Sequence, residues 1–214
     1  METLGVDLAA QSDRTCACRI DWSRPRPLVK IIDWEKPRDW RIDDKKLAAL
    51  VCAPAFAAVG VDVPFGWPIA FKELLAGSGT FTSYDDDADR LRLRETDHFC
   101  AKTTGVTPLS VSADMIAAPA MRWCVLRARM GASASRAHEV YPAAALAAWG
   151  LPHHGYKKAA QSAERATACK RLGDLLALDL DAEHTKWITE SHDALDAVVA
   201  AIVARAIALG RVHP

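Results

Sequence analysis

The sequence predicts a mixed α/β fold, because strand patterns dominate its first third and helical patterns dominate the rest. Three segments, at residues 4–8, 15–22 and 28–34, are apolar or alternate between apolar and polar residues, and short polar links join them. That arrangement is typical of an antiparallel meander. A further apolar run at 55–63 predicts a buried strand, and the apolar stretch at 191–209 predicts a core helix.

The first two strands differ in pattern. The first is apolar except for Asp7, whereas the second alternates over Cys16, Cys18, Ile20 and Trp22. The third is rich in β-branched residues, which strands favour. A charge inside an apolar strand is unfavourable unless it is paired or bound to a metal ion, so the carboxylate of the first strand needs a partner.

The elements after the meander are mostly helices. Residues 43–52 predict a helix with apolar residues on one side, and the strand at 55–63 ends at a proline-bounded loop. We expect a single domain over residues 1–214. The remaining predicted elements are a mostly helical insertion or cap at 69–136 with an irregular stretch at 77–87 and a helix at 115–130, a strand at 138–141, and helices at 156–178 and 191–209.

The composition is that of a globular protein. Of the 214 residues, 50% are hydrophobic and 25% are charged, which is enough apolar surface for a core and excludes general disorder. Lysine and arginine together number 27, and so do aspartate and glutamate. That balance excludes a general polycation that coats nucleic acid or anionic lipid, although it permits a local basic face.

The six cysteines and the N-terminus predict a cytoplasmic protein. No C-x-x-C pair occurs, so a zinc site is weakly supported and a disulfide framework still less, and we expect small buried thiols in a reducing compartment. The N-terminal residues lack a basic start and include Asp7, which does not predict a signal peptide. The apolar stretch at 194–210 contains Asp196 and Arg205, so it predicts a core helix rather than a membrane span.

Acidic residues occur inside elements that are otherwise apolar. Asp7 lies within the first strand, Asp62 lies near the end of the fourth, and Glu139 lies in the short strand His-Glu-Val-Tyr. Asp193 and Asp196 are three residues apart at the start of the last helix, so they share one side of it. Sites in mixed α/β sheets form at strand ends beside helix termini. Carboxylates gathered there would repel one another without a cation, and such clusters favour Mg²⁺ or Mn²⁺.

Each of these acids also has a purely structural interpretation. Asp7 would pair with an arginine, Asp62 would form a turn before a proline, and Glu139 would be an edge-strand charge. Asp193 and Asp196 would favour the positive end of the last helix. The metal-site hypothesis therefore depends on four separate elements that each contribute an acid.

Several motifs resemble those of the DUF429 proteins, a group described as predicted nucleases with a ribonuclease H-like fold. The resemblance spans nearly the whole chain, and its more specific parts are the Glu-Val-Tyr-Pro and Asp-Ala-Leu-Asp-Ala motifs. The matching segments are Gly-Val-Asp at 5–7, Val-Asp-Val-Pro-Phe-Gly at 61–66, Arg-Glu-Thr-Asp at 94–97 with Gly105 and Pro108, Glu-Val-Tyr-Pro at 139–142, Tyr-Lys at 156–157 and Ser-His-Asp-Ala-Leu-Asp-Ala at 191–197.

That resemblance implies a fold and a site. The implied fold is a central five-stranded sheet in the order 3-2-1-4-5, with the first three strands antiparallel, and the strand pattern agrees with it. The implied site combines Asp7, Asp62 and an aspartate of the last helix. The spacing of Asp193 and Asp196 is also similar to that of RuvC-type resolvases, in which two helix aspartates have the same separation.

A nuclease of this class would use two metal ions about 3.5–4 Å apart. Asp7 would bridge them, because a strand-centre carboxylate offers one oxygen to each ion. One ion would activate water and the other would stabilise the leaving 3′-oxygen. His192 has two interpretations, proton transfer and a capping or packing role. The candidate catalytic residues are Asp7, Asp62, Glu139, Asp193 and Asp196, and all of them except Glu139 are candidate ligands of Mg²⁺ or Mn²⁺.

Nucleic acid binding would require a cationic surface. Nine basic residues stand against two acidic ones between residues 121 and 171, and they would either supply phosphate contacts to DNA or RNA or form solvated helix faces. Arg94 and Lys157, from the motifs that resemble the family, are candidate substrate-binding residues. Trp67 would stack a base or cover the core. Residues 85–87, all aspartate, predict a solvated loop, with a second metal site as the alternative.

Three classes of function compete. The first is a metal-dependent nuclease, a hydrolase of phosphodiester bonds. The second is an actin-like phosphotransferase or ATPase, which shares the sheet and the strand-one aspartate. The residues after Asp7 lack the glycines of a phosphate loop, and no G-x-x-x-x-G-K pattern occurs, so this class is less favoured. The third is a non-catalytic binding module of the same fold, and acids retained at four places favour the nuclease over it.

Overall fold

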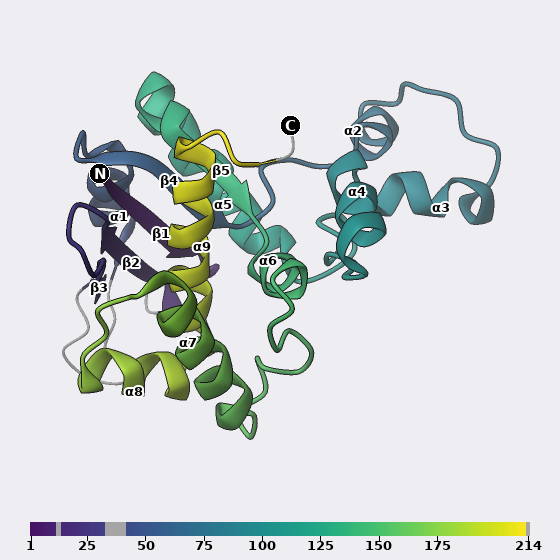
Figure 1. Ribbon diagram of the computed structural model, residues 1–214. Coiled ribbons are helices and arrows are strands. Elements are labelled where there is room, and N and C mark those ends of the chain that lie inside the picture. Colours follow the sequence, from purple (N-terminus) through teal and green to yellow (C-terminus); the bar gives the residue numbers. More distant parts are fainter. Residues whose placement is uncertain (12–13, 33–41, 213–214) are drawn as a thin grey trace.

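The computed structural model describes residues 1–11, 14–32 and 42–212, and it shows a sheet between helical layers (Figure 1). The first three strands form the predicted antiparallel meander, and the last two run parallel to the first. The strand order β3-β2-β1-β4-β5 confirms the predicted order 3-2-1-4-5. The strands are β1 (Glu2–Asp7), β2 (Cys16–Asp21), β3 (Leu28–Ile31), β4 (Phe56–Asp62) and β5 (Ala137–Val140).

One face of the sheet is covered by α1 (Asp44–Cys52) and α5 (Ala117–Met130). Leu4 and Val6 of β1 point to this face, where they are fully buried in the same cluster as Trp123 of α5. Alternation along a strand sends the intervening residues to the opposite face. The packing of α5 makes it part of the core, although the sequence groups it with the helical insertion at 69–136.

The opposite face is covered by the C-terminal helices, and α9 (His192–Ala208) lies directly on the sheet (Figure 1). Residues 194–202 of α9 are all buried, as the prediction of a core helix requires, because a helix that is apolar all round is enclosed by protein. Around it lie α6 (Pro142–Ala148), α7 (Ser162–Leu176) and α8 (Ala182–Glu190).

Two glycines allow α9 to approach the sheet closely. Gly5 of β1 and Gly60 of β4 are partners in the parallel register. A Cβ on Gly5 would lie 2.0 Å from the carbonyl oxygen of Ala197, and one on Gly60 would lie 2.4 Å from that of Ala200. No side chain fits at such distances, so the helix backbone rests on the strand backbones at these two positions.

The first helices of the predicted insertion project beside the sheet (Figure 1). They are α2 (Ile69–Leu75), α3 (Tyr84–Arg92) and α4 (Glu95–Thr104). The prediction of an acidic loop at 85–87 is wrong, because these aspartates form the first turn of α3, where a negative charge favours the helix dipole. Asp87 accepts a hydrogen bond of 2.7 Å from the backbone of Thr82, so a structural role accounts for it.

Other predicted bounds change for a tertiary reason. The helix predicted at 156–178 begins only at Ser162, because the preceding residues form a loop whose carbonyl oxygens accept hydrogen bonds from Arg165. The short helices α6 and α8 were not predicted. The 3-10 helix η2 (Gly131–Arg136) joins α5 to β5.

Replacement of Gly5 by alanine would drive the new methyl group into the backbone of α9. We expect this change to lower the free energy of unfolding by roughly 1–3 kcal/mol or more, the usual cost of overpacking a rigid core. Urea denaturation of the full chain measures it. Gly66→Ala is the matched control, because a Cβ at Gly66 meets nothing within 4 Å. Equal stability of the two variants would contradict the close approach of helix and sheet.

Candidate functional site

Asp7 and Asp62 lie side by side at the carboxyl ends of two neighbouring strands. β1 and β4 are parallel, and their last residues, Asp7 and Asp62, are register partners. The two aspartates follow Gly5 and Gly60 by two positions, so their side chains point to the same face of the sheet, the one that α9 covers. The strand pairing thus brings together two acids that are 55 positions apart in the sequence.

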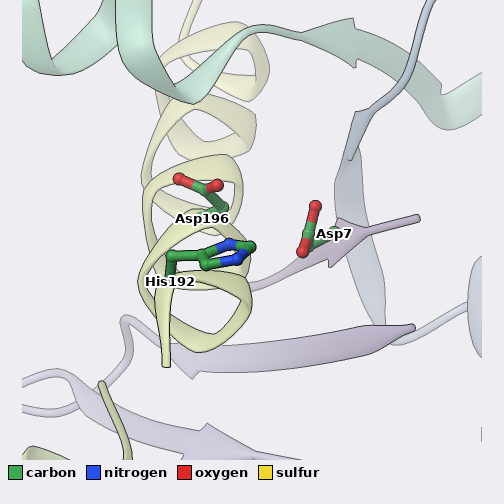
Figure 2. Close-up of side chains that lie close together, drawn as sticks. All are labelled: Asp7, His192 and Asp196. Atoms are coloured by element: carbon green, nitrogen blue, oxygen red, sulfur yellow. The ribbon is translucent and has the colours of Figure 1, made fainter. Parts of the chain in front are cut away.

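The start of α9 adds a third acid and an imidazole. Asp196 lies in the second turn of α9 and is 0% exposed, and His192 is its first residue. One potential ligand atom each of Asp7, His192 and Asp196 lies within 4.8 Å of the others. Figure 2 shows the His192 ring reaching from α9 towards the Asp7 carboxylate. Asp193 lies beside this group, with a carboxylate oxygen 2.8 Å from Nδ1 of His192.

Two consecutive residues of the loop before α7 contact Asp196. The hydroxyl of Tyr156 donates a hydrogen bond of 2.6 Å to Oδ1 of Asp196. The Nζ atom of Lys157 lies 2.8 Å from Oδ2 of Asp196 and 3.8 Å from Oδ2 of Asp62. The role of Tyr156 was not predicted from the sequence, and its only signal there was the Tyr-Lys motif at 156–157. Lys157, predicted to bind substrate, is thus part of the acidic cluster.

The cluster carries more negative charge than its surroundings stabilise. Burial raises the pKa of Asp7 well above its ordinary value, and the carboxylates of Asp196 and Asp62 raise it further. Burial also raises the pKa of Asp62 to about 7, although Lys157 lowers it in part. For Lys157, burial lowers the pKa, but the carboxylates around it outweigh burial and raise it. A cation bound here would relieve the remaining repulsion.

Comparison with protein families gives a match over most of the chain. A family model described as "Protein of unknown function (DUF429)" matches residues 5–214, which include the strands and helix that carry the acids. The chain belongs to the DUF429 family. No curated protein and no solved structure matches it. Among residues 1–11, 14–32 and 42–212 of this DUF429 protein, no helix has the length and apolar character needed to cross a membrane.

Glu139 points to the other face of the sheet from Asp7 and Asp62, although its charge adds to those that raise the pKa of Asp62. It is the register partner of Val61, whose side chain is buried among residues of the α5 face, so Glu139 points away from α9. Its Oε2 accepts a hydrogen bond of 2.8 Å from the backbone of Phe65. The Arg94 guanidinium donates to both carboxylate oxygens, at 3.0 and 2.7 Å. These partners support a structural role for Glu139 in this DUF429 protein.

Arg94 links the projecting helices to the sheet edge. Besides its bidentate pair with Glu139, it donates two hydrogen bonds of 2.9 and 2.6 Å to the buried carboxylate of Asp97. With both carboxylates bound, the guanidinium has little donor capacity left for a substrate. Its predicted contact with substrate has no support in this geometry. Trp67 is half-buried against the core on the α5 face, which supports its covering role over base stacking.

The cationic face predicted between residues 121 and 171 is smaller than expected. Arg122 binds Asp44 and the carbonyl oxygen of Ala9, and Arg136 binds carbonyl oxygens around the end of α1. Arg165 is 2% exposed. For these three arginines the prediction of a phosphate-binding surface is wrong, because each satisfies internal carbonyl oxygens. The exposed basic residues that remain are Arg127, Arg129, Lys157, Lys158, Lys170 and Arg171, of which Lys157 contacts the acidic cluster.

We expect Asp62 to make metal-free protein less stable as the pH rises from about 4 to about 7. The ordinary pKa of an aspartate is 3.8, whereas that of Asp62 in the folded chain is about 7, so the folded state binds more protons in this interval. Thermal denaturation in EDTA tests this. The melting temperature of Asp62→Asn relative to wild type should rise by a few degrees between these pH values. The difference between the two proteins is the readout, because it cancels groups that titrate in both. One of these is His138, whose pKa is lowered by burial, so that it makes the folded protein more stable as the pH rises. A difference that does not change with pH would contradict the raised pKa.

The Glu139→Gln variant separates a structural from a metal-binding role. Loss of a charge-assisted pair with Arg94 should lower the free energy of unfolding by roughly 1–3 kcal/mol, while the affinity for Mn²⁺ should be unchanged. Calorimetric titration with Mn²⁺ and urea denaturation measure the two effects. A large loss of Mn²⁺ affinity with unchanged stability would instead identify Glu139 as a ligand.

Proposed function

We propose that this DUF429 protein is a divalent-metal-dependent nuclease with a ribonuclease H-like fold, which hydrolyses phosphodiester bonds in DNA or RNA. The observation that carries the proposal is the convergence of Asp7, Asp62 and Asp196, with His192, at the end of two parallel strands. The strand order and the position of the C-terminal helix support the fold assignment, which is an analogy at the level of architecture.

The donor set fits a divalent metal ion. Asp7 and Asp196 offer carboxylate oxygens and His192 offers an imidazole nitrogen, all within 4.8 Å of one another. Mg²⁺ prefers oxygen ligands, whereas imidazole suits transition metals. Because the set includes a nitrogen, it favours Mn²⁺ over Mg²⁺ among the two predicted ions. The raised pKa of Asp7 supports binding of a cation, since burial and neighbouring carboxylates leave its charge poorly stabilised in the metal-free protein.

The side chains around the cluster have distinct roles in such a reaction. When bound, the ion would supply Lewis acidity and lower the pKa of a water molecule. Tyr156 orients the Asp196 carboxylate through its hydroxyl. The Lys157 ammonium would donate a hydrogen bond to a phosphate oxygen of the substrate. Asp62 would accept a proton at Oδ2, because it lies beside Asp7 and outside the group of potential metal ligands.

A side-chain nucleophile has no support in this site. Cys16 is the register partner of Asp7 on β2 and is the nearest thiol by strand pairing. It is buried, and burial followed by the charge of Asp7 raises its pKa well above the ordinary value. A protonated thiol is a poor nucleophile. The chemistry of the cluster therefore favours attack by water.

A non-catalytic binding module is the second candidate, and one observation favours it. Lys157 already pairs with Asp196 and lies near Asp62, so part of the acidic charge is neutralised by the chain itself. In that case the cluster would only hold the loop at 156–157 against α9. The two candidates differ in whether the remaining charge binds a metal ion.

Cleavage of labelled single- and double-stranded DNA and RNA in Mn²⁺ tests the nuclease proposal. Asp7→Asn should lower the cleavage rate by at least about 100-fold, since even residues that only support a metal ligand contribute 10–100-fold. The fold should persist, because the change removes a charge that repels its neighbours. Asp174→Asn is the control, since that carboxylate lies on the surface of α7.

Two results would contradict the proposal. One is a purified Asp7→Asn protein that cleaves as fast as wild type. The other is an affinity for Mn²⁺ that Asp7→Asn leaves unchanged. Nucleic acid binding without cleavage, and without any dependence on Mn²⁺, would support the binding module.

A further inference from the structure

We propose that Lys157 is a built-in cation of this site, which takes the position of a second divalent ion, so that the site binds one metal ion per chain. This inference rests on the proposed function, and it replaces the two-ion arrangement that the sequence predicts. It assigns separate positions to the metal ion and to the Lys157 ammonium. The metal ion would lie next to Asp7 and His192, and the ammonium lies next to Asp62.

The position of Lys157 defines these two sides. Its Nζ atom contacts Asp196 at 2.8 Å and Asp62 at 3.8 Å. Within the part of the chain that the structure describes, Asp7, His192 and Asp196 form a group that could hold a metal ion. Asp196 is thus common to both positions, as a bridging carboxylate would be in a two-ion site. Asp62, predicted to hold one of the two ions, faces the ammonium instead.

The loop that carries Lys157 is held in place by a buried arginine. Nη1 of Arg165 donates hydrogen bonds to the carbonyl oxygens of Tyr156, at 2.6 Å, and Lys158, at 2.9 Å, the residues on either side of Lys157. Its Nε donates a bond of 2.7 Å to the carbonyl oxygen of Thr189 in α8. Lys157 is therefore presented by a fixed backbone, unlike a lysine on a freely exposed loop.

The side chains of Tyr156 and Lys157 each contact one oxygen of the Asp196 carboxylate. Tyr156 is 1% exposed, and its hydroxyl binds Oδ1 of Asp196. The neighbouring Lys157 contacts Oδ2 of the same carboxylate. Consecutive residues thus bind the two oxygens of one buried acid, which fixes the carboxylate and the ammonium relative to each other. A buried carboxylate without such partners would be strongly destabilised.

Repulsion between like charges favours one metal ion. The Lys157 ammonium already supplies one positive charge to the carboxylates of Asp62 and Asp196. A second divalent ion near Asp62 would lie within a few ångströms of the ammonium, where like charges repel strongly. The Lys157 side chain is also 45% exposed, so its ammonium has room to contact a substrate phosphate as well.

Mn²⁺ titration of the full chain tests the inference. Wild type should bind one Mn²⁺, and Lys157→Ser, which removes the ammonium and leaves space, should bind two. Electron paramagnetic resonance provides a second readout, because two adjacent Mn²⁺ ions are magnetically coupled whereas one is not. Lys158→Ser is the matched control, since Lys158 is the exposed neighbour, and it should bind one ion as wild type does.

The outcomes distinguish this inference from the proposed function. Two ions in wild type, or one ion in both wild type and Lys157→Ser with equal affinity, would overturn the role of Lys157 but leave a metal site that Asp7→Asn abolishes. Binding of Mn²⁺ to neither protein would overturn both proposals. If Lys157→Ser does not fold, Lys157→Gln preserves the length of the side chain, removes the charge and is titrated in the same way.

Discussion

Close contact between the backbone of α9 and the backbones of β1 and β4 is the constraint on which the site depends. Gly5 and Gly60 leave no side chain between them and the carbonyl groups of Ala197 and Ala200. A larger residue at Gly5 or Gly60 would move the helix outward. Since Asp196 directly precedes Ala197, that contact also determines how near its carboxylate lies to the strand ends. Close packing at these glycines therefore determines how strongly the Asp196 carboxylate interacts with the carboxylates at the strand ends.

The same geometry places an unfavourable charge in the interior. Two strand-end carboxylates and one helix carboxylate are desolvated together, which raises the pKa of Asp7 and Asp62. The chain offsets part of this cost with the Tyr156 hydroxyl and the Lys157 ammonium. Sites that retain such repulsion commonly trade stability for function, and here the remaining charge is what a divalent cation would stabilise.

Two arginines, one buried and one partly buried, connect segments around the cluster. Arg165 fixes the loop that carries Lys157, and Arg94 ties the projecting helices to Glu139 at the sheet edge. A guanidinium has five donors in a rigid plane, so one side chain can hold several backbone segments or carboxylates at once. Three of the six arginines between residues 121 and 171, Arg122, Arg136 and Arg165, are therefore internal connectors in this protein.

The sequence by itself determined the strands, the core helix and the two acids at the strand ends, because alternation and apolar runs are local patterns. Resemblance to the DUF429 family supplied the strand order, which structure confirmed. Only the tertiary structure decided that Glu139 points away from α9, since its face depends on its register with β4. It alone placed Lys157 among the acids and Arg165 beneath its loop. Such contacts join segments far apart in the chain, and they follow from packing rather than from any periodicity along the sequence.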